Sequence, residues 1–140
     1  MAGFQASENM NRHRLAWMQR IAAAAIVVFW ITFWADHDGF PPDVLDCESN
    51  FIIPDLVWIA GLLLIASYWL KKDDSRGIVV SSAAAGGLVF LGLLDVHFNW
   101  RHGQYASSPQ VWLNVVVHAG YIWFGLWTLV VMIHGSVRGK

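Results

Sequence analysis

Four polar residues in the C-terminal half of the chain are spaced so that they could form one site. Asp95 and Asn99 are four residues apart, and so are Asn114 and His118. Residues four apart lie on one face of a helix, so each pair forms a short polar stripe. The two stripes lie in neighbouring apolar segments joined by a short connection, so we expect them to face each other at similar depth.

An ionisable side chain inside an apolar segment is costly, and such groups usually face a cavity or a partner. Asp95 is therefore the most informative residue, and two interpretations stay open. One is a structural clasp in which Asp95 bonds to His118, or Asn99 to Asn114, and holds two helices together. The other is a site for a ligand, an ion or a reaction.

If the stripes form a binding site, Asp95 is its charged anchor and Asn99, Asn114 and His118 orient the ligand. Aromatic faces beside a carboxylate suit a cationic ligand, although tryptophans also gather at membrane interfaces. The predicted remaining contacts are one acid and four aromatic residues: Glu48, Trp30, Trp34, Trp58 and Tyr121.

Three other functions fit the same residues. Asp95 and His118 could act as the acid–base pair of an enzyme that acts on a lipid-soluble substrate. The chain could be a proton- or cation-coupled transporter, which we expect to be a homodimer because four helices barely enclose a path. It could also be a structural subunit of a membrane complex. The stretch from Asp95 to Tyr105 looks motif-like, but it indicates no named activity.

A second polar group follows the first apolar segment and could offer metal ligands. Its candidates are His37, Asp38, Cys47 and Glu48, but their spacing matches no calcium-loop pattern. We therefore predict no metal site, and these four residues are the candidates if one exists. The sequence assigns no cofactor, because only His97 and His118 could pair across a bundle as haem ligands, and His97 is rotated by about 200° from Asp95.

The elements that must position these residues are membrane-spanning helices. The chain has 140 residues, of which 56% are hydrophobic and 14% charged. A helix needs about 20 mostly apolar residues to cross a bilayer. Four segments qualify, at about 15–36, 54–70, 77–99 and 111–134, with outer loops at 37–53 and 100–110. We predict an all-α, polytopic membrane four-helix bundle that forms a single domain over residues 1–140.

The basic residues predict the orientation of the bundle. Eight of the nine Lys and Arg lie in the two tails and the middle loop, and only Arg101 lies at the other end. The positive-inside rule then places both termini in the cytoplasm, and we expect the chain in the plasma (inner) membrane. Its partner is the lipid bilayer; a net charge near zero indicates no nucleic-acid partner.

Small residues predict where the helices pack most closely. They occupy positions 22–25 and 81–87, in the inner halves of the first and third spans. Close approach of small residues is a main source of attraction between helices in lipid, and Ser82 with Gly86, or Ala83 with Gly87, has the required spacing. The outer halves are bulky, so we expect a bundle that is tight inside and opens a pocket outward.

Overall fold

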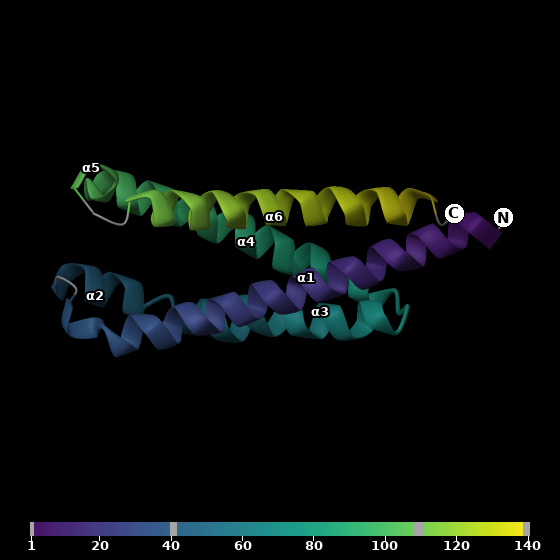
Figure 1. Ribbon diagram of the computed structural model, residues 1–140, viewed down its shortest axis with the longest axis horizontal. Coiled ribbons are helices and arrows are strands. Elements are labelled where there is room, and N and C mark those ends of the chain that lie inside the picture. Colours follow the sequence, from purple (N-terminus) through teal and green to yellow (C-terminus); the bar gives the residue numbers. More distant parts are fainter. Residues whose placement is uncertain (1, 40–41, 108–110, 139–140) are drawn as a thin grey trace. The chain divides into compact units, whose positions relative to one another are not determined.

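The structure, a computed structural model, describes residues 2–39, 42–107 and 111–138 (Figure 1). These ranges contain helices, turns and short connections and no strand. The chain divides into two compact units, Met1–Ser81 and Ser82–Lys140, and each is described by itself.

Four helices are long and apolar enough to cross a membrane, by length and composition. They cover Asn11–Ala35, Val44–Lys71, Arg76–Arg101 and Val115–His134. The predicted all-α class with four membrane-spanning helices is therefore confirmed, and the chain is a multi-pass membrane protein.

In the first unit, one long helix packs along a second span. Helix α1 (Ala2–Ala35) is followed by a 3₁₀ turn, η1 (His37–Gly39), and by α2 (Pro42–Ser49). The second span continues through the π-helix η2 (Pro54–Ala60) into α3 (Gly61–Lys71), which lies beside α1 (Figure 1). Buried residues recur every three or four positions from the end of η2 through α3, at Ile59, Leu63, Ala66 and Leu70, as expected for a helix with one packed face.

The second span begins earlier than its sequence suggests. The segment 37–53, predicted as an outer loop, contains α2, and the span extends back to Val44 rather than beginning at residue 54. A sequence-based prediction places the start of this span at Pro54, because proline has no backbone N–H to donate and interrupts regular α-helical hydrogen bonding. The chain continues through a wider π-helical segment instead of ending. Likewise, α5 (Gln104–Ser107) occupies part of the predicted outer loop 100–110.

The turn between α3 and α4 (Arg76–Arg101) is held by a charged cap. Asp73 adopts a left-handed conformation with a φ of 54°. The backbone N–H of Arg76 donates to Asp74 Oδ1 at 2.9 Å, and its guanidinium also donates to that carboxylate. These hydrogen bonds lower the pKa of Asp74 to about 2. A carboxylate at this position satisfies a free N–H and meets the positive end of the helix dipole.

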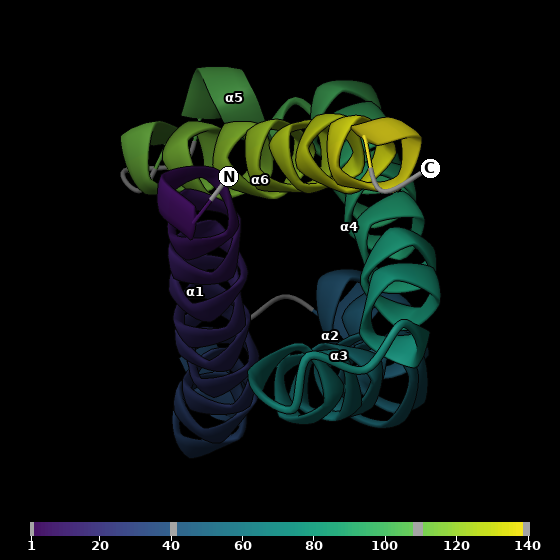
Figure 2. The same cartoon turned by 90° about the vertical axis from the view of Figure 1, so that its right-hand side faces the viewer.

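In the second unit, α4 and α6 (Val111–Arg138) approach each other so closely that glycine is required at two contacts (Figure 2). A Cβ at Gly92 would lie 2.7 Å from Ile122 Cγ1 and 3.1 Å from the His118 carbonyl oxygen. A Cβ at Gly125 would lie 2.7 Å from the Ala85 carbonyl oxygen. Each helix contributes one glycine to these contacts, and a side chain at either glycine would overlap the neighbouring helix.

The small-residue prediction is partly right. Gln19 of α1 donates to the Ser81 hydroxyl at 2.8 Å, so the first and third spans do meet at this point in the first unit. Within the second unit, Gly86 makes no close contact, because a Cβ there would meet nothing within 4 Å. The close packing in α4 falls instead on Ala85 and Gly92, which are seven residues apart and share one face.

We predict that Gly125→Ala destabilises the protein by about 1–3 kcal/mol, the usual range for overpacking. The new methyl would press on a backbone carbonyl, which cannot move aside cheaply. Gly86→Ala is the matched control in the same pair of helices. It fills open space and restricts the unfolded chain, so it should be neutral or stabilising. Thermal unfolding in detergent measures both; equal losses of stability in the two variants would contradict the close contact.

Candidate functional site

A histidine in the second unit contacts two other ionisable side chains through its two ring nitrogens. The Tyr105 hydroxyl lies 2.9 Å from His118 Nδ1, within hydrogen-bonding distance. On the other side of the ring, His118 Nε2 lies 3.8 Å from Asp95 Oδ2. That distance allows an ion pair when His118 is protonated but is too long for a direct hydrogen bond. We call Asp95, Tyr105 and His118 the histidine cluster.

Three helices position this cluster. The close contact of Gly92 with the His118 backbone brings α4 and α6 together one turn before Asp95. After α4, Gly103 adopts a φ of 65°, a left-handed conformation that glycine reaches at no steric cost. The short α5 follows and packs against α6, so that Tyr105 reaches the imidazole.

The cluster is largely shielded from its surroundings. The whole of His118 is only 8% exposed, and the Asp95 side chain is 24% exposed. Burial and the nearby Asp95 carboxylate together raise the pKa of the Tyr105 phenol above its usual value of about 10. The phenol is therefore neutral at physiological pH and can donate to His118 Nδ1, or accept from it in the other tautomer.

The structure describes three other predicted ligand contacts, Asn99, Asn114 and Tyr121, to different extents. Asn99 is buried, but its amide nitrogen donates to the backbone carbonyl of Asp95 at 2.9 Å, within its own helix. The side chain of Asn114 lies outside those that the structure describes. Tyr121 is half-buried on α6. Their roles as ligand contacts stay predictions.

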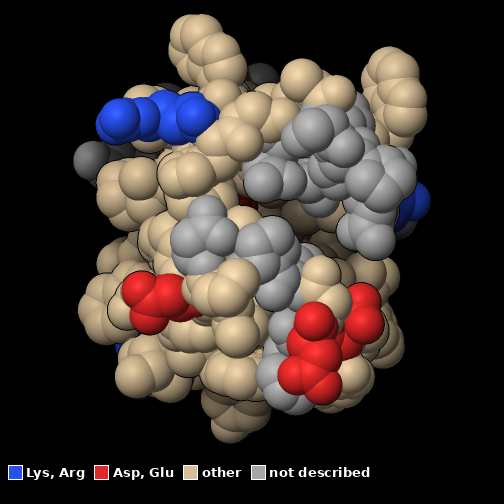
Figure 3. Space-filling view, turned by 90° about the vertical axis from the view of Figure 1, so that its left-hand side faces the viewer, with Lys and Arg blue, Asp and Glu red and all other residues tan. Residues whose placement is uncertain are grey.

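The first unit contains a second polar contact at its acidic end. The indole N–H of Trp30 donates to Asp55 Oδ2 at 3.0 Å, across from α1 to the first turn of η2. The other oxygen, Asp55 Oδ1, is buried and has no hydrogen-bond partner. Glu48 is half-buried and close enough to interact electrostatically with Asp55. Acidic side chains are visible on the end of the molecule shown in Figure 3.

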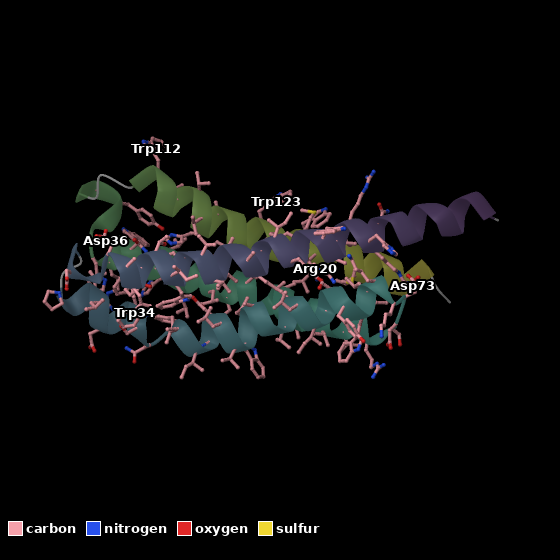
Figure 4. All side chains as sticks on the ribbon, turned by 60° about the horizontal axis from the view of Figure 1, so that its bottom comes forward. Arg20, Trp34, Asp36, Asp73, Trp112 and Trp123 are labelled. Atoms are coloured by element: carbon pink, nitrogen blue, oxygen red, sulfur yellow. The ribbon has the colours of Figure 1, made fainter. Side chains whose placement is uncertain are left out.

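Trp34 and Trp58, the other predicted wall residues, are open to their surroundings. Trp34 is 45% exposed and Trp58 is 64% exposed. Figure 4 places Trp34 and Asp36 at one end of the first unit and Asp73 at the other. Trp30, Trp34, Trp58 and Glu48 belong to the first unit and Asp95 to the second, so a pocket lined by all of them stays a prediction.

The described side chains include no group of three His, Cys, Asp or Glu residues that could hold a metal ion. Of the four candidates, Asp38 is exposed in η1, and Cys47 and Glu48 are half-buried in α2. The side chain of His37 lies outside the described part of the structure, so the complete set is not tested.

Two residues of these contacts were not selected from the sequence. Tyr105 lies at the end of the motif-like stretch, and neither Tyr105 nor Asp55 is among the predicted ligand contacts. The signal for Tyr105 was Gly103, because a glycine in a short connection between two spans indicates a reversal of the chain. Asp55 follows Pro54 directly, an order typical of a helix start, so its place in the sequence does not indicate a partner on another helix.

We predict that the Tyr105 phenol titrates above pH 10, as measured by the ultraviolet difference between the wild type and Tyr105→Phe. Asp95→Asn should lower this pKa, but only in part, because burial is the larger cause of the shift. The folded protein holds the phenolic proton to a higher pH than the unfolded chain does. Stability should therefore fall as the pH rises above about 10, and less so in Tyr105→Phe. If Asp95→Asn leaves the pKa of Tyr105 unchanged, the proximity of these two residues in the histidine cluster is contradicted.

Comparison of the chain with protein-family models, with curated proteins and with solved structures found no match. A fold of four membrane helices is shared by proteins of unrelated activity, so the fold alone does not name a function. The functional argument therefore rests on the chemistry of the described side chains.

Proposed function

We propose that this membrane protein binds a small lipid-like or cationic ligand at the histidine cluster, with Asp95 as the charged anchor. The observation that carries the proposal is the placement of His118, which is almost fully buried between Tyr105 and Asp95. A buried imidazole with a neutral phenol on one side and a carboxylate on the other offers both donors and acceptors to a ligand.

A structural clasp made by Asp95 and His118 themselves fits the geometry less well. A clasp gains its stability from a direct hydrogen bond between the helices, and such a bond needs a separation of about 3 Å. The His118 and Asp95 atoms are 3.8 Å apart, so their direct contact contributes little of that kind. Apolar surroundings and a carboxylate instead favour a cation whose body is hydrophobic. In our proposal, the site lies in a pocket that opens toward the outer face.

An enzyme with the histidine cluster at its centre is the second candidate. Proton transfer between two side chains requires a separation of about 2.6–3.2 Å, or a bridging water. The 2.9 Å contact between Tyr105 and His118 meets this condition, whereas the separation of Asp95 and His118 does not. In this second candidate, Tyr105 and His118 exchange the proton and Asp95 stabilises the imidazolium.

The binding proposal predicts that purified protein binds tetraphenylphosphonium, a hydrophobic cation, more tightly than tetraphenylborate, an anion of the same shape. Asp95→Asn should weaken binding of the cation by about tenfold or more, which corresponds to about 1.4 kcal/mol, and should leave binding of the anion unchanged. Quenching of tryptophan fluorescence during titration gives both affinities.

Asp46→Asn is the control, because Asp46 is an exposed acid of the first unit and carries the same charge. If both variants weaken cation binding equally, the effect reflects overall charge and the anchor role of Asp95 is wrong. If Asp95→Asn also retains full thermal stability and full cation binding, neither a clasp nor an anchor describes the residue.

We further propose that both termini face the cytoplasm and that the protein resides in the plasma (inner) membrane. The support is the distribution of basic residues, of which eight of nine gather at one end of the spans. Asp46 would then face outward, and Lys72 would face the cytoplasm.

The single native cysteine makes this orientation measurable. In a Cys47→Ser background, Asp46→Cys and Lys72→Cys each introduce one thiol at an exposed position. In intact cells, a membrane-impermeant maleimide should label the first variant but label the second only after lysis. The opposite pattern would reverse the topology.

A further inference from the structure

A group of basic and aromatic residues lies at the opposite end of the first unit from Trp34 and Asp36. Trp17 and Arg20 come from α1 and Lys71 from the end of α3, and Figure 4 shows Arg20 toward the end that carries Asp73. The Arg20 guanidinium carbon lies 5.6 Å from the centre of the Trp17 ring, and Lys71 Nζ lies 4.4 Å from the same centre. The two positive charges are therefore within about 10 Å of each other.

Arg20 is held in place by a buried hydroxyl. Its Nε donates to Ser67 Oγ at 3.1 Å, across from α1 to α3. Ser67 is only 1% exposed, and its own hydroxyl donates to the Leu64 carbonyl at 2.8 Å. This bond fixes one edge of the guanidinium against the helix pair, so Arg20 is not free to extend fully toward water as a typical interfacial arginine does.

The two cations have no carboxylate partner among the described residues. Arg76, at the same end of the unit, differs in this respect, because it forms an ion pair with Asp74 at 2.6 Å and also lies over the Trp69 ring. Like charges held close together repel each other, and a cation inside a span is costly unless it meets an opposite charge. Arg20 and Lys71 therefore form a site with positive charge that the described part of the protein does not neutralise.

We propose that Trp17, Arg20, Lys71 and Ser67 form a binding site for the phosphate of an anionic phospholipid headgroup. A guanidinium with a fixed edge presents its remaining N–H groups to phosphate oxygens, and a lysine adds a second charge from the other helix. Trp17 is 57% exposed, as expected of an indole at the level of the lipid headgroups. Basic sites between membrane helices bind such headgroups, and the charge and the interfacial indole favour lipid over a soluble anion.

The test uses full-length protein in nanodiscs of phosphatidylcholine that contain a minor fraction of phosphatidylglycerol. Native mass spectrometry then counts the phosphatidylglycerol molecules retained by the protein. Arg20→Gln and Lys71→Gln should each lower this retention about fivefold, and the losses should persist at 1 M salt, where exposed charges are screened. Lys72→Gln is the matched control, because Lys72 is exposed, adjacent in sequence and equal in charge.

Ser67→Ala tests the same site without changing the charge. It releases Arg20 from its fixed position, so it should also lower retention of phosphatidylglycerol, which a model based on overall charge does not predict. If Arg20→Gln fails to fold, Lys71→Gln and Ser67→Ala decide the question by themselves. Equal effects of Lys71→Gln and Lys72→Gln at 1 M salt would overturn the proposal.

A competition experiment distinguishes lipid from free phosphate. Addition of 10 mM inorganic phosphate should leave the bound phosphatidylglycerol in place, because the indole and the membrane surface favour a lipid. Displacement of the lipid by phosphate would overturn the assignment to a headgroup. Retention of phosphatidylcholine should be the same in every variant, and a parallel loss would indicate a general change of the lipid-facing surface and would also overturn the proposal.

Discussion

The constraint on which the rest of the structure depends is the lack of water inside a membrane. In a soluble protein, water can supply the hydrogen bonds of a polar side chain. Within lipid, the hydrogen-bond partner must come from the protein or from a bound molecule. The described residues show this at several depths. Gln19 meets Ser81, Arg20 meets Ser67, Trp30 meets Asp55 and His118 meets Tyr105, each between different helices. Most of these pairs join two membrane-spanning helices, so the polar residues also specify which helices are neighbours.

The two proposals concern places where charged or ionisable side chains lie close together. At the histidine cluster, the imidazole and the Asp95 carboxylate are near each other without a direct hydrogen bond. At the basic end of the first unit, two cations share one indole without an acid. A charged side chain is costly in an apolar medium, and a bound ligand of opposite charge lowers that cost. The two places differ in sign, and we accordingly assign a cationic ligand to one and an anionic headgroup to the other.

Close packing and polar pairing depend on each other in the second unit. The contact of Gly92 with the His118 carbonyl sets the separation of α4 and α6 immediately before Asp95. A larger residue at this position would move the helices apart and with them the carboxylate and the imidazole. The same dependence explains why the close contact involves Ala85, Gly92 and Gly125 and not Gly86, although Gly86 lies in the stretch with the most small residues. Which small residues are used is decided by the face that meets the neighbour, and composition alone does not contain that information.

The sequence by itself determined the class of the protein, because the length of an apolar run and the need to satisfy every backbone group in lipid leave only the helix as a solution. It also identified Asp95 and His118 as an informative pair, because four-residue spacing places side chains on one face of each helix. It did not identify Tyr105, Asp55 or Ser67 as partners, nor the extension of the second span to Val44. These depend on contacts between residues far apart in sequence and on how the chain continues beyond Pro54. Spacing along one helix predicts a shared face, but only the tertiary structure decides what that face meets.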